Sequence, residues 1–275
     1  MIAPDKSSSN SPQNVMRSIE RAMGGAAGTS TAKQRQAQEC VYDAWEAATA
    51  DDALELIHEA LELDSRNVDA WLMLLHACDY STDERIEFLR KLVDMGAKNL
   101  GSKIMKQKGH FWGVLETRPY MRARAELASA YQEAGRPEDA VKEYEGMLEL
   151  NPNDNQGNRY CLMGLYLQLD RVDKARGLFE KYDEREFSAI WAWGYVLERL
   201  IAGAEDDAVA ALDDARKQNA HAEAYIKGHL KIPKRMPDQY AVGSREEAII
   251  CADVLRPAWE QHPEALAWIK RQKKS

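Results

Sequence analysis

The sequence contains few cysteines, and no two of them are closely spaced. Only four occur in 275 residues, at Cys40, Cys78, Cys161 and Cys251, and no Cys-x-x-Cys motif is present. This spacing indicates neither a disulfide framework nor a zinc site. The histidines likewise form no pair at metal-ligating spacing. We therefore expect no metal, no cofactor and a reducing compartment.

Long apolar runs are lacking too. The longest, at 189–197, is far shorter than the roughly 20 residues that span a bilayer. The opening residues, MIAPDKSSSNSPQN, contain no apolar core of the kind that a secretory signal needs. These features predict a cytoplasmic protein with no membrane partner.

Basic residues are not in surplus. The chain has 37 Lys and Arg against 45 Asp and Glu, which gives a formal net charge of -8. Because phosphate binding needs an excess of cationic side chains, we expect no nucleic-acid partner. The local basic cluster KIPKR, at 231–235, is interpreted as a solvated segment.

The N-terminal segment has few residues that could form a core. Residues 1–32 are rich in Ser, Asn, Gly and other small residues, so this segment is predicted to be a flexible tail. Its run from Gly24 to Gly28 is not followed by Lys-Ser or Lys-Thr, and therefore does not match a phosphate-binding loop.

From Lys33 onward, apolar residues recur at helical spacing and β-branched residues are sparse, which predicts an all-α fold. The clearest pattern begins with an apolar stripe that contains Leu127 and Tyr131. Gly135 is expected to end that helix in a left-handed conformation, and Pro137 to open the next. The same arrangement returns about 35 residues later.

These residues resemble the tetratricopeptide repeat, a helical hairpin of about 34 residues. Leu-Ala-x-x-Tyr, Gly-Arg, Asp-Ala and Asn-Pro stand at the family's spacing between 127 and 152, while Arg124 replaces the usual tryptophan. The resemblance implies a right-handed superhelix of stacked helical hairpins, an α-solenoid, whose first helices line a concave binding face.

Weaker copies of the hairpin lie on both sides of this pattern. Two helix starts carry the signature of a capping box, at Ser81 with Glu84 and at Ser244 with Glu247. The expected organisation is a flexible tail at 1–32, N-terminal helical hairpins at 33–96, a connecting segment at 97–118, tetratricopeptide-like repeats at 119–220 and a C-terminal helical cap at 221–272.

The order of the segments carries a second resemblance. GHFWGVLETRPYMRA, then LNPNDNQGNRY and later GSREEAI, is similar to soluble bacterial relatives of the suppression-of-tumorigenicity-seven family. This resemblance covers roughly 37–269, although the chain lacks the membrane-spanning segments of the eukaryotic members. It implies a helical-repeat scaffold without catalytic activity, and it supplies no ligand.

The segment 109–127 could hold catalytic groups, with His110 and Glu116 as acid and base and arginines to bind an anion. General acid–base catalysis also needs a concave pocket, which the pattern does not predict. We interpret the segment as a joint between helical layers. Thr117 is expected to cap the next helix, and Glu116 to pair with Arg118 or Arg122.

The leading hypothesis is a non-catalytic scaffold or adaptor that binds a protein or peptide through the concave face. The alternatives are a ligand- or peptide-responsive sensor and, less favoured, an enzyme with a site near His110, Glu116 and Arg118. Tyr160 and Trp193 could instead pack between hairpins, because aromatics serve either role. The oligomeric state is left open. The residues predicted to contact the partner are Arg118, Arg122, Ser129, Gln132, Asn158, Arg159, Tyr160 and Trp193.

Overall fold

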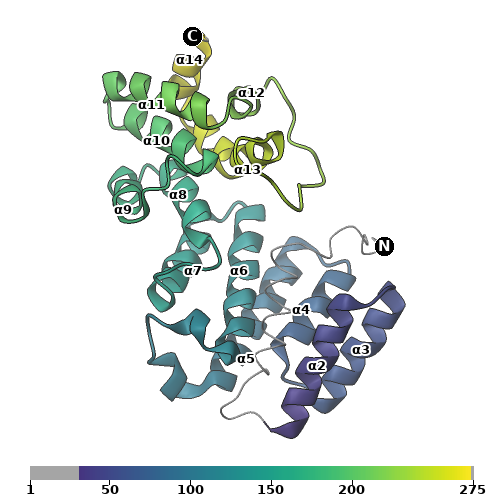
Figure 1. Ribbon diagram of the computed structural model, residues 1–275. Coiled ribbons are helices and arrows are strands. Elements are labelled where there is room, and N and C mark those ends of the chain that lie inside the picture. Colours follow the sequence, from purple (N-terminus) through teal and green to yellow (C-terminus); the bar gives the residue numbers. More distant parts are fainter. Residues whose placement is uncertain (1–30, 274–275) are drawn as a thin grey trace. The chain divides into compact units, whose positions relative to one another are not determined.

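The all-α prediction is confirmed over the part of the chain that can be described. The structure is a computed structural model that describes residues 31–273. Those residues form helices and connecting loops, with no strand among them (Figure 1). The fold class is an all-α helical-repeat solenoid. The predicted tail at 1–32 lies almost entirely outside the described residues.

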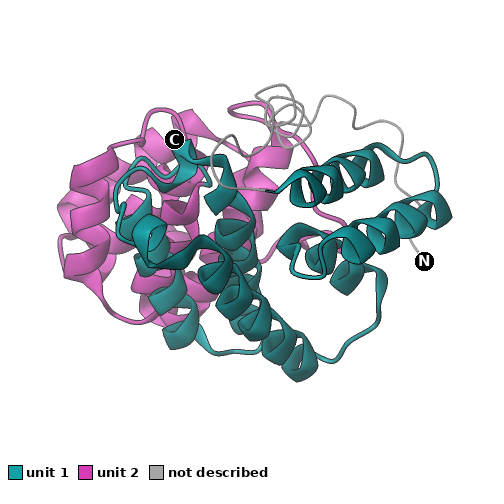
Figure 2. Cartoon of the chain, turned by 90° about the horizontal axis from the view of Figure 1, so that it is seen from below, with its two compact units in different colours: residues 1–156 teal, residues 157–275 magenta. Residues whose placement is uncertain are grey.

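The chain divides into two compact units, and the boundary lies between Gln156 and Gly157 (Figure 2). Unit 1 ends at Gln156 and unit 2 begins at Gly157. This boundary falls inside the segment 119–220, which was expected to form one set of repeats. The right-handed superhelical course stays a prediction.

Unit 1 is a series of helical hairpins. Its first helices are neighbours, because α4 packs against both α2 and α6. The face that these first helices form is called the first-helix face of unit 1 below. The hairpins are α2 (Ala32–Glu46) with α3 (Ala50–Leu63), α4 (Val68–Ala77) with α5 (Thr82–Met105), and α6 (Arg118–Glu133) with α7 (Pro137–Leu150).

Unit 2 continues with hairpins and ends in three further helices. The first helices α8 and α10 are in contact, and they form the first-helix face of unit 2. Helix α13 packs against α8, α10 and α12. The elements are α8 (Asn158–Gln168), α9 (Val172–Tyr182), α10 (Ala189–Ile201), α11 (Glu205–Gln218), α12 (Ala222–Ile226), α13 (Arg245–Gln261) and α14 (Pro263–Arg271).

The helix ends follow local sequence signals, with two exceptions. Ser81 and Glu84 form the predicted reciprocal capping box at the start of α5. Gly135 is left-handed, with φ of +66°, as expected. Ser244 accepts a hydrogen bond from the backbone N–H of Glu247 at 3.1 Å, but the carboxylate of Glu247 bonds elsewhere. The prediction that Thr117 caps α6 is wrong, because its hydroxyl donates to the carbonyl of Val114 at 2.7 Å.

The segment before α6 has the features of a joint. Two short 3-10 turns, η2 (Phe111–Gly113) and η3 (Leu115–Thr117), pack against α6. Phe111 is fully buried, and its ring meets the ring of Tyr120 edge to face, with centroids 6.3 Å apart. The Arg118 guanidinium lies over the ring of Trp112 and its Nε donates to the Trp112 carbonyl at 3.0 Å. These contacts support the structural interpretation of this segment.

Candidate functional site

One polar network ties together the three first helices of unit 1. Arg122 of α6 binds Asp69 of α4 through two hydrogen bonds, Nε to Oδ1 at 2.9 Å and Nη2 to Oδ2 at 2.5 Å. The Asp69 side chain is 1% exposed, whereas that of Arg122 is 20% exposed. The Arg122 guanidinium also lies 5.5 Å from the ring centre of Trp45, on α2. The arginine therefore has a fixed orientation, because paired hydrogen bonds and a ring both constrain it.

Two amides complete this network around Asp69. Gln38 of α2 donates from Nε2 to Asp69 Oδ2 at 3.2 Å, and Asn67 Nδ2 donates to Gln38 Oε1 at 3.3 Å. The oxygen of the Asn67 amide, Oδ1, accepts from the N–H of Ala70 at 2.9 Å and caps α4. Asp69 is thus a buried carboxylate with both charge and hydrogen-bond partners, as such groups require.

A second charged cluster lies farther along α6. Arg85 donates to Glu126 at 3.1 Å and to Glu133 at 2.7 Å, and His76 Nε2 lies 3.3 Å from Glu126. Burial raises the pKa of Glu126, but the hydrogen bond from His76 and the charge of Arg85 outweigh it, so the pKa lies below its usual value. Glu126 is therefore a carboxylate at neutral pH, not a proton donor.

Helix α6 also carries a row of small or polar side chains, spaced along the helix after Arg122. Ala125 and Ser129 are half-buried, and Gln132 is exposed. The Ser129 hydroxyl donates to Glu133 at 3.4 Å, while Gln132 accepts a hydrogen bond from the Tyr144 hydroxyl at 2.8 Å. The structure thus places Arg122, Ser129 and Gln132 along one helix, as the repeat spacing predicts.

Arg159 and Tyr160 form a cluster of their own in unit 2. Arg159 Nε donates to Glu184 at 3.0 Å, and its guanidinium lies 4.4 Å from the ring centre of Tyr160. The Tyr160 hydroxyl donates to the same carboxylate. Burial and the hydrogen bond to Glu184 raise the pKa of Tyr160. Both side chains are half-buried and engaged, so they are less available to a partner than their residue types suggest.

Three of the predicted contact residues lie in the interior. Trp193 is 0% exposed, and Asn158 and Arg118 are each 6% exposed. Trp191, the neighbouring tryptophan on α10, meets the ring of Tyr160 edge to face at 5.4 Å. This burial favours the alternative in which Trp193 packs between hairpins, and in this conformation a partner cannot reach it.

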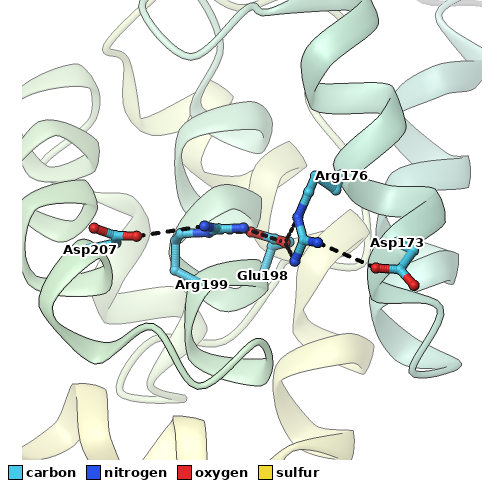
Figure 3. Close-up of polar contacts among 5 residues, drawn as sticks. All are labelled: Asp173, Arg176, Glu198, Arg199 and Asp207. Carbon is cyan, nitrogen blue, oxygen red and sulfur yellow. Dashed lines mark hydrogen bonds and ion pairs between the residues drawn. The ribbon is translucent and has the colours of Figure 1, made fainter.

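A buried carboxylate on α10 was missed by sequence reasoning. Glu198 is 0% exposed and lies between Arg176 of α9, at 2.9 Å, and Arg199, at 2.7 Å (Figure 3). Asp173 and Asp207 flank the two arginines at 3.3 and 3.6 Å. Because guanidinium groups occupy the Glu198 oxygens, this group is suited to holding helices together and not to proton transfer. The one available signal was a glutamate within the apolar run AIWAWGYVLERLI.

Two shallow hollows lie beside α5. The larger, of about 490 Å³, lies between α5, α6 and α7, and neither of the two hollows is lined by His110, Glu116 or Arg118. Within 31–273, no three His, Cys, Asp or Glu side chains are grouped to hold a metal ion. No helix in that range has the length and apolar character needed to cross a membrane.

Comparison with known proteins gives a family match. A tetratricopeptide repeat model matches residues 131–192, which confirms that resemblance over this segment. A comparison with curated protein sequences finds no match. The closer resemblance to the suppression-of-tumorigenicity-seven family is not confirmed.

Solved structures similar to this chain include two proteins of low identity. One is the MamA protein, with a TM-score of 0.46, 19% identity, and coverage of 72% of this chain and 98% of that chain. The other is YrrB, a TPR protein with an unusual peptide-binding site, with a TM-score of 0.43, 18% identity, and coverage of 74% of this chain and 90% of that chain.

Proposed function

We propose that this chain is a non-catalytic scaffold that binds a protein or peptide on the first-helix face of unit 1. The observation that carries the proposal is the contact between Arg122 and the ring of Trp45. Asp69 holds Arg122 in place beside the half-buried side chains of Ala125 and Ser129. Arginine and tryptophan are the residue types that most often dominate interface energies. A fixed side chain also loses less conformational entropy on binding than a mobile one.

The tetratricopeptide match supports the proposal, because stacked hairpins present their first helices as a binding surface. The segment around His110 offers less support for catalysis. His110 is exposed, Glu116 is half-buried, and Arg118 is buried against Trp112. Residues that act together in acid–base catalysis face a common pocket, and the different burial of these three side chains does not favour such an arrangement.

Site-specific photocrosslinking tests the proposed surface. A benzophenone amino acid replaces Gln132 in one variant and Glu138, an exposed residue at the start of α7, in a matched control. Irradiation in the cells that make the protein should give a discrete adduct from position 132 and none from position 138. Mass spectrometry of the adduct identifies the partner.

A second substitution, Ser129→Arg, is then added to the variant that carries the crosslinker at position 132. Its long charged side chain covers the row of small or polar side chains on α6. We expect the yield of the adduct to fall by about tenfold or more, the effect of losing a central interface contact. Circular dichroism should be unchanged, because Ser129 is half-buried and on the helix surface. Equal adducts from both positions, or an adduct insensitive to Ser129→Arg, would exclude this face.

A further inference from the structure

The first-helix face of unit 2 is covered by the chain's own helix α13. Gly164 and Leu167 of α8 are both buried. A Cβ atom added at Gly164 would lie 2.9 Å from the carbonyl oxygen of Val254, in α13. Only a glycine allows the two helix backbones to approach this closely. Helix α13 therefore sits directly on α8, and it also packs on α10.

The same positions in unit 1 are not covered in this way. Ser129 and Gln132 of α6 stand one repeat before Gly164 and Leu167, and they are half-buried and exposed, respectively. Unit 2 thus holds a helix where unit 1 has an accessible surface. Equivalent surfaces in the two units differ in whether the chain itself supplies an occupant.

Polar contacts hold α13 at both of its ends. At the N-terminal end, the buried Glu247 carboxylate accepts hydrogen bonds from the Ala189 N–H at 2.9 Å, Asn219 Nδ2 at 2.9 Å and the Gly243 N–H at 2.7 Å. The first of these donors opens α10, so Glu247 also satisfies an N-terminal amide of that helix. At the other end, the ring nitrogen Nε2 of His262 donates to the Leu167 carbonyl at 2.8 Å.

The buried face of α13 consists mainly of small and apolar side chains. Small residues allow neighbouring helices to approach closely, and larger ones fill the remaining space. The indole N–H of Trp259 is buried with no acceptor among the described residues. A buried donor without an acceptor costs free energy, so it reduces the stabilisation gained when α13 packs in this position. The buried residues of this face are Ala248, Ile249, Cys251, Ala252, Leu255, Ala258 and Trp259.

The connection to α13 is long and has no regular structure. Residues 228–243 lie outside any helix, and Lys231, Lys234 and Arg235 are exposed. Figure 1 shows this connection, residues 228–243, curving away from α12 and returning to the start of α13; it is called the strap below. A connection of this length does not by itself fix the position of α13. An extended chain spans about 3.3 Å per residue, so the connection would also allow α13 to lie elsewhere. The seat is therefore set by the contacts described above.

We propose that α13 is an intramolecular ligand of the first-helix face formed by α8 and α10. This face is an acceptor for an amphipathic α-helix with small residues along one side and a glutamate in its first turn. A partner protein that presents such a helix binds here by displacing α13. The proposal concerns a second surface and does not depend on the binding surface of unit 1.

Cleavage of the strap tests whether α13 behaves as a ligand. A site for a specific protease is inserted into the full-length chain after Lys234, and the cleaved protein is mixed with a fluorescent peptide of residues 243–272. We expect retained helical circular dichroism and exchange of the resident segment for the peptide, measured by anisotropy. Loss of the helical signal on cleavage, or no exchange, would overturn the proposal.

Two peptide variants make this test specific. Glu247→Gln removes the negative charge that accepts hydrogen bonds from four donors, Gln218 Nε2 at 3.3 Å included, so the affinity of this peptide should fall by about tenfold or more. Glu246→Gln alters the exposed neighbour and should bind like the unmodified peptide. Equal affinities of the two variant peptides would show that the Glu247 carboxylate does not hold α13 in its position.

Thiol labelling provides a measurement on the uncleaved chain. Cys251 is 0% exposed, and burial raises the pKa of its thiol well above the usual value, so it reacts only when α13 leaves its seat. Gly164→Ala places a methyl group against Val254 and should speed Cys251 labelling by about tenfold, without changing Cys40 in unit 1. Gly177→Ala on α9, where the added carbon meets nothing within 4 Å, is the matched control.

Two outcomes of the labelling experiment would count against the proposal. Equal Cys251 rates in the Gly164→Ala and Gly177→Ala variants would show that α13 does not leave independently. A Gly164→Ala chain that dimerises in size-exclusion chromatography would identify a second copy, and not a separate partner, as the competing source of the helix.

Discussion

At the scale of single residues, unit 2 is organised around buried carboxylates that have cationic partners. Glu223 is 2% exposed and binds Arg216 at 2.9 Å and Lys227 at 2.5 Å, while Glu198 lies between two arginines. A buried ion pair need not increase stability relative to an apolar pair, but removing one partner leaves a buried charge that costs several kcal/mol. These residues are therefore sensitive to substitution although none has a catalytic geometry.

Glu223→Gln should make the chain less stable in a pH-dependent way. Burial raises the pKa of Glu223, but hydrogen bonds from Arg216 and Lys227 outweigh it, so the folded pKa lies below the unfolded value of about 4.3. The carboxylate therefore contributes its full stabilisation above that value, and the contribution is lost as pH falls through the folded pKa. At pH 7 the free energy of unfolding should fall by about 3 kcal/mol.

Urea denaturation of wild type and variant at pH 7 and at successively lower pH measures this difference. It should shrink below a pH of about 4, where the wild-type carboxyl also becomes protonated. Glu180→Gln, at an exposed position on α9, is the control and should have little effect. A gap that stays constant down to the lowest pH at which the chain is folded would contradict the assignment.

At the scale of elements, two helices begin with a serine followed three residues later by a glutamate, and the glutamate has a different role in each. Ser81 and Glu84 satisfy each other's backbone amides, as a capping box does. Ser244 and Glu247 have the same spacing, yet the Glu247 carboxylate reaches α10 and Asn219 instead. The difference arises because another helix start lies beside Glu247, and its unpaired amide competes for the carboxylate.

Ser81→Ala should lower the free energy of unfolding by about 1 kcal/mol, because one N-terminal amide of α5 loses its acceptor. Lys98→Ala, at an exposed position in the same helix and before its non-helical residue Gly101, should change it by less than about 0.5 kcal/mol. Thermal and urea unfolding followed by circular dichroism measure both. Equal effects of the two substitutions would show that the cap does not stabilise α5.

At the scale of the whole molecule, each unit contains a buried acidic residue that links several of its helices, which is called an acidic tie here. Asp69 joins the first helices of unit 1 through Arg122 and Gln38, and Glu247 joins α13 to α10 in unit 2. Since the chain divides into two compact units, we expect substitutions at these ties to affect mainly the unit that contains them.

Arg122→Met should destabilise unit 1 by about 3 kcal/mol, because Asp69 is then a buried charge without its cation. Labelling of Cys40, which is 7% exposed in unit 1, should accelerate more than labelling of Cys251 in unit 2. Arg90→Met, at an exposed position on α5, is the control. Equal acceleration of both cysteines in Arg122→Met would mean that the units unfold together.

The sequence by itself determined the all-α class, the hairpin spacing around Leu127 and Tyr131, and helix ends such as Ser81 and Gly135. Helical periodicity, capping and left-handed glycines are local properties, so a single chain displays them. The sequence also placed Arg122, Ser129 and Gln132 on one helix.

Only the tertiary structure decided which of these side chains a partner could reach. Arg122 with Asp69, Arg159 with Glu184 and Gly164 with Val254 are pairs of residues far apart in sequence, and no local pattern encodes such proximity. Burial is likewise a property of the packed molecule. Helix α13 has the amphipathic pattern of an end cap, and its seat on α8 and α10 is set by how closely their backbones can approach.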